Sequence, residues 1–221
     1  MKTLNRFIFS VLCVILFFPL SMQAQDLFFL NQEGKSVEYS IADAKGKIQS
    51  YTKSTVKEIK KTDAKNYTIV YTSEVMDANK KPLMDPMTVE TVVVDGVIVQ
   101  DPVAAMGEAG KDVKVEGNFP EFPSELSVGQ TFGEYSYTMK MMGTSTTTKG
   151  SSKVVAKEEI TTPAGSFDCY KVESESSSKV MLQTTKVSTT SWYAKNLGAV
   201  RTETYDKKGK VQTVMELVAV K

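Results

Sequence analysis

The stretch VETVVVDGVIVQ, residues 89–100, decides the fold class. Two runs rich in β-branched residues flank the pair Asp95-Gly96. An Asp-Gly pair accepts positive φ at both positions, and a turn of this kind matches the right-handed twist of paired strands. The stretch therefore predicts a β-hairpin with a two-residue type I′ turn.

Outward from this hairpin, short stretches rich in Val, Ile, Thr, Tyr and Phe alternate with turn-forming clusters. This pattern is typical of an all-β protein. We expect about ten or eleven strands in a strongly curved antiparallel sheet or partial β-barrel, arranged as a meander. A helical fold is disfavoured, because the Ser- and Thr-rich runs at 143–152 and 186–192 have low helix propensity and no 3.6-residue apolar period.

Residues 102–130 interrupt the alternation. They include Pro120 and Pro123, and proline is excluded from ordinary strand interiors. A structureless connection of this length is uncommon in a compact domain. We therefore expect a lid, a short helix with loops, or a segment that covers a sheet edge.

The first 24 residues have the three-part organisation of a secretory signal peptide. A short basic stretch precedes an apolar run at residues 7–20, and the small-residue site SMQA ends the segment. The run is shorter than the roughly 20 residues that span a bilayer. Cys13 lies inside the run and not at its end, so no lipid attachment is expected. We predict a single β domain at residues 25–221 that is exported, periplasmic or extracellular, and soluble.

The composition argues against several classes of function. The formal net charge of +1 becomes −1 when Lys2 and Arg6 leave with the signal peptide, so nothing favours a nucleic-acid partner. The chain has no histidine, which excludes Ser-His-Asp and Cys-His catalysis and histidine-ligated zinc. We predict no catalytic residue, no metal and no cofactor, and we do not expect an enzyme.

Cys169 is the only cysteine outside the predicted signal peptide. Alternation places Phe167 on its own face of the strand and Tyr170 and Val172 on the other face. A thiol in such apolar surroundings packs as a small hydrophobic side chain and is unreactive. An exposed thiol that pairs with another chain is the alternative.

Close carboxylate pairs, of the kind that glycosidases use, occur at Glu158-Glu159, Glu173 with Glu175, and Glu203 with Asp206. They lie in Lys-rich or Ser-rich stretches, and no aromatic-lined cleft is indicated around them. We interpret them as residues of a solvated sheet face.

Three stretches resemble TapB-like exported bacterial proteins, a group largely of unknown function. They are FPSELSVGQTF at 122–132, TPAGSFDCYKV at 162–172 and WYAKNLGAVRTETYDKKGKV at 192–211. The resemblance implies a strongly curved antiparallel sheet, a partial barrel similar to that of periplasmic lipoprotein carriers. These motifs are turns and strand starts, so the resemblance implies a fold and no chemistry.

One set of side chains indicates a binding surface. Period-two alternation gathers aromatic residues and methionines on one face of two predicted strands, and the only tryptophan begins a third. The candidate ligand-binding residues are Tyr67, Tyr71, Tyr135, Tyr137, Met139, Met141 and Trp192. On the concave side of a curved sheet, methionine would adapt its shape to a ligand and tyrosine would offer a polar tip. A closed core, in which these residues pack on one another, is the alternative.

These observations favour a non-catalytic exported β domain that binds an apolar small molecule or a lipid on its concave face. The alternative is a structural or protein-interaction module that meets another envelope protein through strand edges or the Thr-rich face. An enzyme is the least favoured class, because no general base is evident.

Overall fold

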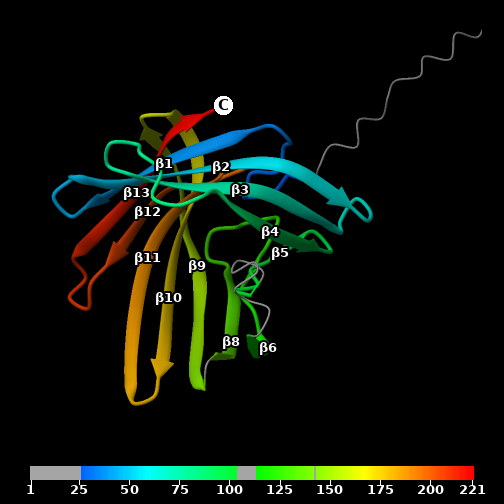
Figure 1. Cartoon of the computed structure of the whole chain (residues 1–221), viewed down its shortest axis with the longest axis vertical. Coiled ribbons are helices and arrows are strands. Elements are labelled where there is room, and N and C mark those ends of the chain that lie inside the picture. The colour runs from blue at the N-terminus through cyan, green and yellow to red at the C-terminus, as the bar shows by residue number, and fades with distance from the viewer. Residues whose placement is uncertain (1–25, 104–112, 142) are drawn as a thin grey trace, which may run out of the picture.

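A computed structural model describes residues 26–103, 113–141 and 143–221; the predicted signal peptide lies outside these residues. All the strands belong to one antiparallel sheet (Figure 1), and the described residues contain no helix. The strands are β1 (Ser36–Asp43), β2 (Ile48–Lys61), β3 (Tyr67–Asp77), β4 (Met87–Val94), β5 (Val97–Val99), β6 (Lys114–Asn118), β7 (Glu121–Phe122), β8 (Thr131–Met141), β9 (Thr144–Thr162), β10 (Gly165–Val180), β11 (Gln183–Ala194), β12 (Gly198–Tyr205) and β13 (Val211–Val220).

The sheet order is β6-β8-β9-β10-β11-β12-β13-β1-β2-β3-β4-β5-β7. It follows the chain except where β13 pairs with β1 and at the two edges. In Figure 1, β9, β10 and β11 run down the view whereas β1, β2 and β3 run across it, so the sheet is strongly bent. The predicted curved antiparallel sheet is confirmed. The thirteen strands of the described residues exceed the ten or eleven predicted, because β6 and β7 are too short to give a clear sequence pattern.

The hairpin at residues 89–100 is confirmed. Val94 at the end of β4 pairs with Val97 at the start of β5. The two residues between them have positive φ, 50° at Asp95 and 80° at Gly96. This is the backbone conformation that a type I′ turn requires.

The segment 102–130 supplies both edges of the sheet. Its strand β6 pairs with β8, and its strand β7 pairs with β5. Only Phe119 and Pro120 separate these two strands, and such a linker spans at most about 11 Å. The sheet must therefore curl until its edges nearly meet. Of the three expectations for this segment, the edge-covering one is confirmed for its described part, and residues 104–112 lie outside the described residues.

The backbones of β7 and β8 approach closely at this closure. A Cβ atom at Gly133 in β8 would lie 2.9 Å from the carbonyl oxygen of Glu121 in β7, and Gly133 has a φ of 61°. Only glycine suits both conditions. The curled sheet thus nearly closes into a barrel, with the hydrophobic core inside it.

Cys169 is fully buried, which confirms the packing interpretation and shows that the alternative of an exposed thiol is wrong. Burial, with smaller contributions from the carboxylates of Asp168 and Glu158, raises the pKa of the thiol to about 12. We expect the native protein not to react with an aromatic disulfide reagent at about pH 8, and the unfolded protein to react at once. Rapid labelling of the native protein would contradict this burial.

Tyr67 lies in the core with 3% of its surface exposed. Its hydroxyl is the one buried side-chain polar atom of the described residues without a hydrogen-bond partner. An unpaired buried hydroxyl costs about 1–3 kcal/mol. We therefore expect Tyr67→Phe to raise the free energy of unfolding by about 1 kcal/mol in urea denaturation. The matched variant Tyr71→Phe removes a hydroxyl that lines the pocket described below and interacts with Thr91, so it should not raise the free energy of unfolding. A loss of stability in Tyr67→Phe would contradict the prediction.

Candidate ligand-binding pocket

Residues 26–35 precede β1 and lie against the side of the sheet that faces the core; we call this segment the strap and this side the inner face. The turn between β11 and β12 holds the strap in place. The backbone N–H of Asn196 donates to the carbonyl oxygen of Leu27 at 2.6 Å, and the side-chain amide of Asn196 donates to Asp26 at 2.9 Å. Leu27 itself is fully buried.

The strap inserts aromatic rings among those of the sheet. The ring of Phe28 lies 5.5 Å from that of Tyr170 in an edge-to-face arrangement and 6.1 Å from that of Phe122. The ring of Phe29 lies 5.8 Å from that of Tyr71. Pairs at these distances stabilise a core beyond the area that they bury. The strap is therefore part of the packed interior.

A pocket of about 260 Å³ lies between the strap and the inner face. Its walls come from the strap, β1, β2, β3, β5, β7 and the β11 to β13 region. The lining is mainly apolar and includes Phe28, Phe29, Leu30, Val37, Val56, Tyr71, Ile98, Phe122, Ala199 and Met215. At about 30 Å³ for each water-sized group, the pocket has room for roughly eight or nine heavy atoms.

Two tyrosines give the pocket a polar side. Tyr39 and Tyr193 both line it. Burial raises the pKa of each hydroxyl, and their mutual proximity raises that of Tyr39 further. Both hydroxyls therefore stay neutral near pH 7 and can donate a hydrogen bond to a ligand. Tyr71, Ser54 and Gln100 are the other residues of the lining whose side chains carry a polar group.

The structure distributes the predicted binding residues over several places. Tyr71 lines the pocket, whereas Tyr67 is buried in the core. The four residues on β8 lie elsewhere: the rings of Tyr135 and Tyr137 stack at 5.9 Å, Tyr135 lines a polar groove, Met139 is half-buried and Met141 is 41% exposed. The set does not form one site.

The strap residues of the pocket were missed in the sequence. They follow the predicted cleavage site directly, in a region with no strand pattern. The available signal was the run LFFL at residues 27–30, four large apolar residues at the start of the predicted domain. Such a run, placed before the first strand, indicates a segment that packs on the sheet.

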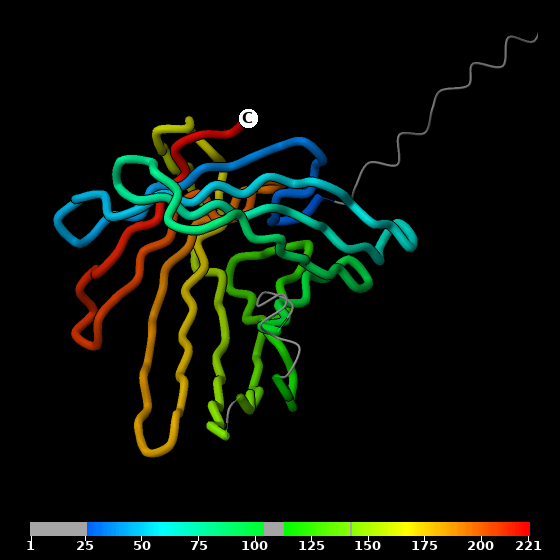
Figure 2. Tube along the Cα trace, viewed as in Figure 1, coloured from blue at the N-terminus to red at the C-terminus, as the bar shows by residue number. Residues whose placement is uncertain are grey.

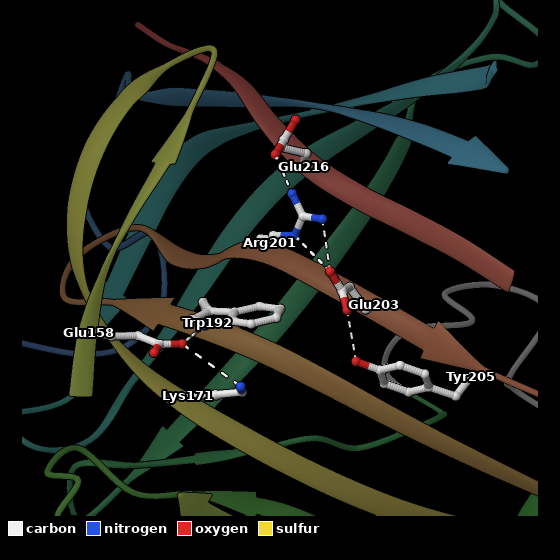
Figure 3. Close-up of polar contacts among 7 residues, drawn as sticks. All are labelled: Glu158, Lys171, Trp192, Arg201, Glu203, Tyr205 and Glu216. Carbon is white, nitrogen blue, oxygen red and sulfur yellow. Dashed lines mark hydrogen bonds and ion pairs between the residues drawn. The ribbon is translucent and has the colours of Figure 1, made fainter. Parts of the chain in front are cut away.

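Trp192 lies on the face opposite to Tyr193, because successive residues of a strand alternate. Its indole N–H donates to Glu158 at 2.6 Å, and the cations of Lys171 and Arg201 lie 5.3 and 5.9 Å from its ring. Figure 3 shows these side chains projecting from neighbouring strands. Trp192 is therefore held by a polar network and does not line the pocket.

The same network binds two carboxylates to Arg201. Its guanidinium donates to Glu203 and to Glu216, each at 2.8 Å, and the hydroxyl of Tyr205 donates to Glu203 at 2.8 Å (Figure 3). The contacts join β12 to β13. Because Glu203 is engaged in this way, it is a poor general base, and we assign the network a structural role.

The network predicts a loss of stability in acid. Burial disfavours the Glu203 carboxylate, but hydrogen bonds from Tyr205 and Arg201 outweigh it, so the pKa of Glu203 is lowered from 4.5. The carboxylate of Glu203 therefore adds to the free energy of unfolding above about pH 4.5, and this stabilisation is lost as the pH falls through the lowered pKa. We expect Glu203→Gln to have a lower free energy of unfolding than the wild type at neutral pH, and we expect this difference to become smaller below about pH 4.

Glu134→Gln, at an exposed position, is the control. A difference between Glu203→Gln and the wild type that stays constant with pH would contradict the prediction.

Within the described ranges, no group of His, Cys, Asp and Glu side chains is arranged to hold a metal ion. No helix in the same ranges is long and apolar enough to cross a bilayer.

Comparison with known proteins identifies the family. The family model described as DUF3108-like matches residues 32–217. The chain belongs to the DUF3108-like family. The match runs from the strap to Leu217 in β13 and so includes all of the described sheet except the end of β13. No curated protein matches the chain significantly.

Two solved structures show that other proteins share the fold. A predicted exported protein of Bacteroides fragilis with a YmcC-like fold is 25% identical, covers 89% of this chain and 99% of its own, and has a TM-score of 0.68. A predicted lipoprotein of Parabacteroides distasonis is 24% identical, covers 90% of this chain and 100% of its own, and has a TM-score of 0.70. The curved-sheet fold that the resemblance implies is thus confirmed, and the family that the comparison shows is DUF3108-like. The TapB-like grouping stays a prediction.

Proposed function

We propose that this DUF3108-like chain is a non-catalytic exported β domain that binds an apolar small molecule, or a short segment of a lipid chain, in the pocket under the strap. The observation that carries the proposal is the pocket itself, lined mainly by apolar side chains within a closely packed interior. Pockets of this character are the usual sites of small-molecule binding.

The size and the polar side of the pocket define the ligand class. Room for roughly eight or nine heavy atoms suits a medium-length alkyl chain. The neutral hydroxyls of Tyr39 and Tyr193 suit a ligand with one hydrogen-bonding group, such as an alcohol or an ester. No cation is among the lining residues, so a carboxylate would be bound less well than an alcohol.

Binding is favoured over catalysis by the chemistry of the lining. Its titratable side chains are tyrosines whose raised pKa values keep them protonated. The carboxylates Glu158 and Glu203 are engaged with Trp192 and Arg201, on the face opposite the pocket. An interaction module that works through strand edges has less support, because the edge strand β7 lies beside β8.

Export is part of the proposal. The first 24 residues have the pattern of a signal peptide, and both solved structures belong to proteins named as exported or lipoprotein. We propose the cell envelope as the location.

The test is a titration of the purified domain with 1-octanol, in which saturation-transfer NMR measures the binding. Ala199 lines the pocket, and in Ala199→Leu three added carbons would fill about a third of it. We expect saturable binding to the wild type and binding at least about tenfold weaker in Ala199→Leu. Ala219→Leu, on β13 and equally half-buried but outside the pocket, is the matched control. Equal binding by all three proteins, or by none, would overturn the proposal.

A further inference from the structure

The hairpins β8–β9 and β10–β11 end together at one end of the molecule (Figure 2). Met181 and Leu182 form the turn of β10–β11 and are 80% and 96% exposed. In the strand register, Val180 lies opposite Thr146 of β9, and Met141 lies opposite Thr144 nearer the tip. Exposed apolar side chains of the two hairpins are thus gathered at this end, which we call the apolar tip.

Three lysines surround the approach to the apolar tip. Lys149 and Lys186 lie on either side of Ser177 in the register, and Lys179 lies on the same face, nearer the tip. All three line a groove of about 1100 Å³ that crosses β8 to β11, and within the described residues none of them has an ion-pair partner. Glu134 and Glu175 are the acids of the same groove, so cations are in excess.

We propose that this end of the sheet docks on the surface of an anionic phospholipid bilayer, with Met181 and Leu182 inserted among the acyl chains and the three lysines on lipid phosphates. This proposal does not rest on ligand binding in the pocket. It explains why two large apolar side chains stand at the end of a long hairpin next to unpaired cations.

The spacing of these groups fits the layers of a membrane. At about 3.3 Å per residue, Lys179 and Lys186 lie roughly 7 to 13 Å behind Leu182 along the hairpin. Interfacial segments bury their apolar residues about 5–10 Å deep. With Leu182 at that depth, the flexible lysine side chains would lie at the level of the headgroups.

A bilayer fits this surface better than a protein partner does. A stable protein interface needs about 800 Å² from each partner, and a two-residue turn between thin hairpins offers far less. A bilayer needs only insertion of a few side chains together with electrostatic attraction. Each lysine near an anionic surface adds binding energy that salt weakens.

The test is co-sedimentation of the full mature domain with vesicles, either phosphatidylglycerol with phosphatidylethanolamine or phosphatidylcholine alone. We expect binding to the anionic vesicles that is at least about tenfold weaker in Met181→Ser/Leu182→Ser. The affinity of the triple variant Lys149→Gln/Lys179→Gln/Lys186→Gln for anionic vesicles should fall by a similar factor. Binding to neutral vesicles should be weak for every protein.

Leu83→Ser/Met84→Ser is the matched control, because these two residues are also exposed, 59% and 51%, but lie in the β3–β4 connection. The control should bind as the wild type does, and thermal denaturation would verify that all variants fold. The proposal is overturned if the wild type does not bind anionic vesicles or if Met181→Ser/Leu182→Ser binds them as well as the wild type does. It is also overturned if the control loses as much vesicle affinity as Met181→Ser/Leu182→Ser.

Discussion

Phe122→Ala is expected to lower the free energy of unfolding by about 3–5 kcal/mol. Phe122 lies in β7, at the closure of the curled sheet, and is 6% exposed. Its ring contacts Phe28 of the strap, Phe132 of β8 and Tyr193 of β11, with ring centres 6.1, 5.1 and 4.6 Å away. Truncation removes all three contacts and leaves a cavity where three parts of the chain meet.

Urea denaturation with fluorescence detection measures this effect, and the melting temperature should fall by about 10 °C. Phe119→Ala is the matched control, because Phe119 is half-buried and its ring contacts that of Tyr137. Phe119→Ala should lower the free energy of unfolding clearly less than Phe122→Ala does. Similar losses for the two variants would mean that Phe122 does not join the edges of the sheet in the way described.

Leu27→Ala is expected to lower the free energy of unfolding by about 3 kcal/mol. Leu27 is fully buried although it precedes the first strand. Its side chain and the hydrogen bonds of its backbone to Asn196 hold the strap on the sheet. Loosening the strap also loosens one wall of the pocket, so octanol binding should weaken in the same variant.

Leu83→Ala removes the same atoms from an exposed position, 59% accessible, and should change stability by no more than about 0.5 kcal/mol. Hydrogen exchange gives a second readout, because the amides of the strap should exchange faster in Leu27→Ala than in Leu83→Ala. If the two variants are equally stable, the strap is not a structural part of the domain.

The sheet could be predicted from the sequence because its signals are local. The pair Asp95-Gly96 between two β-branched runs specifies a turn by its own backbone preference, and alternation specifies which residues share a face. The same local rules placed Tyr71 on the inner face. They do not say where a strand lies around a curled sheet.

The pocket could not be predicted for this reason. Its walls meet because β13 pairs with β1 and because the linker of β6 and β7 draws the two edges together. Both are contacts between distant parts of the chain. Tyr135 and Tyr71 have the same pattern of alternation, yet one lines the polar groove and the other lines the pocket.

The most direct test uses the methionine methyl groups as reporters of where an apolar ligand binds. Met215 lines the pocket, Met139 and Met141 belong to the predicted face on β8, and Met181 is at the apolar tip. In a carbon-13 methyl spectrum, titration with 1-octanol should shift the Met215 signal saturably and leave the other three in place. A Met215 signal that does not move, or shifts confined to Met139, Met141 and Met181, would contradict binding under the strap.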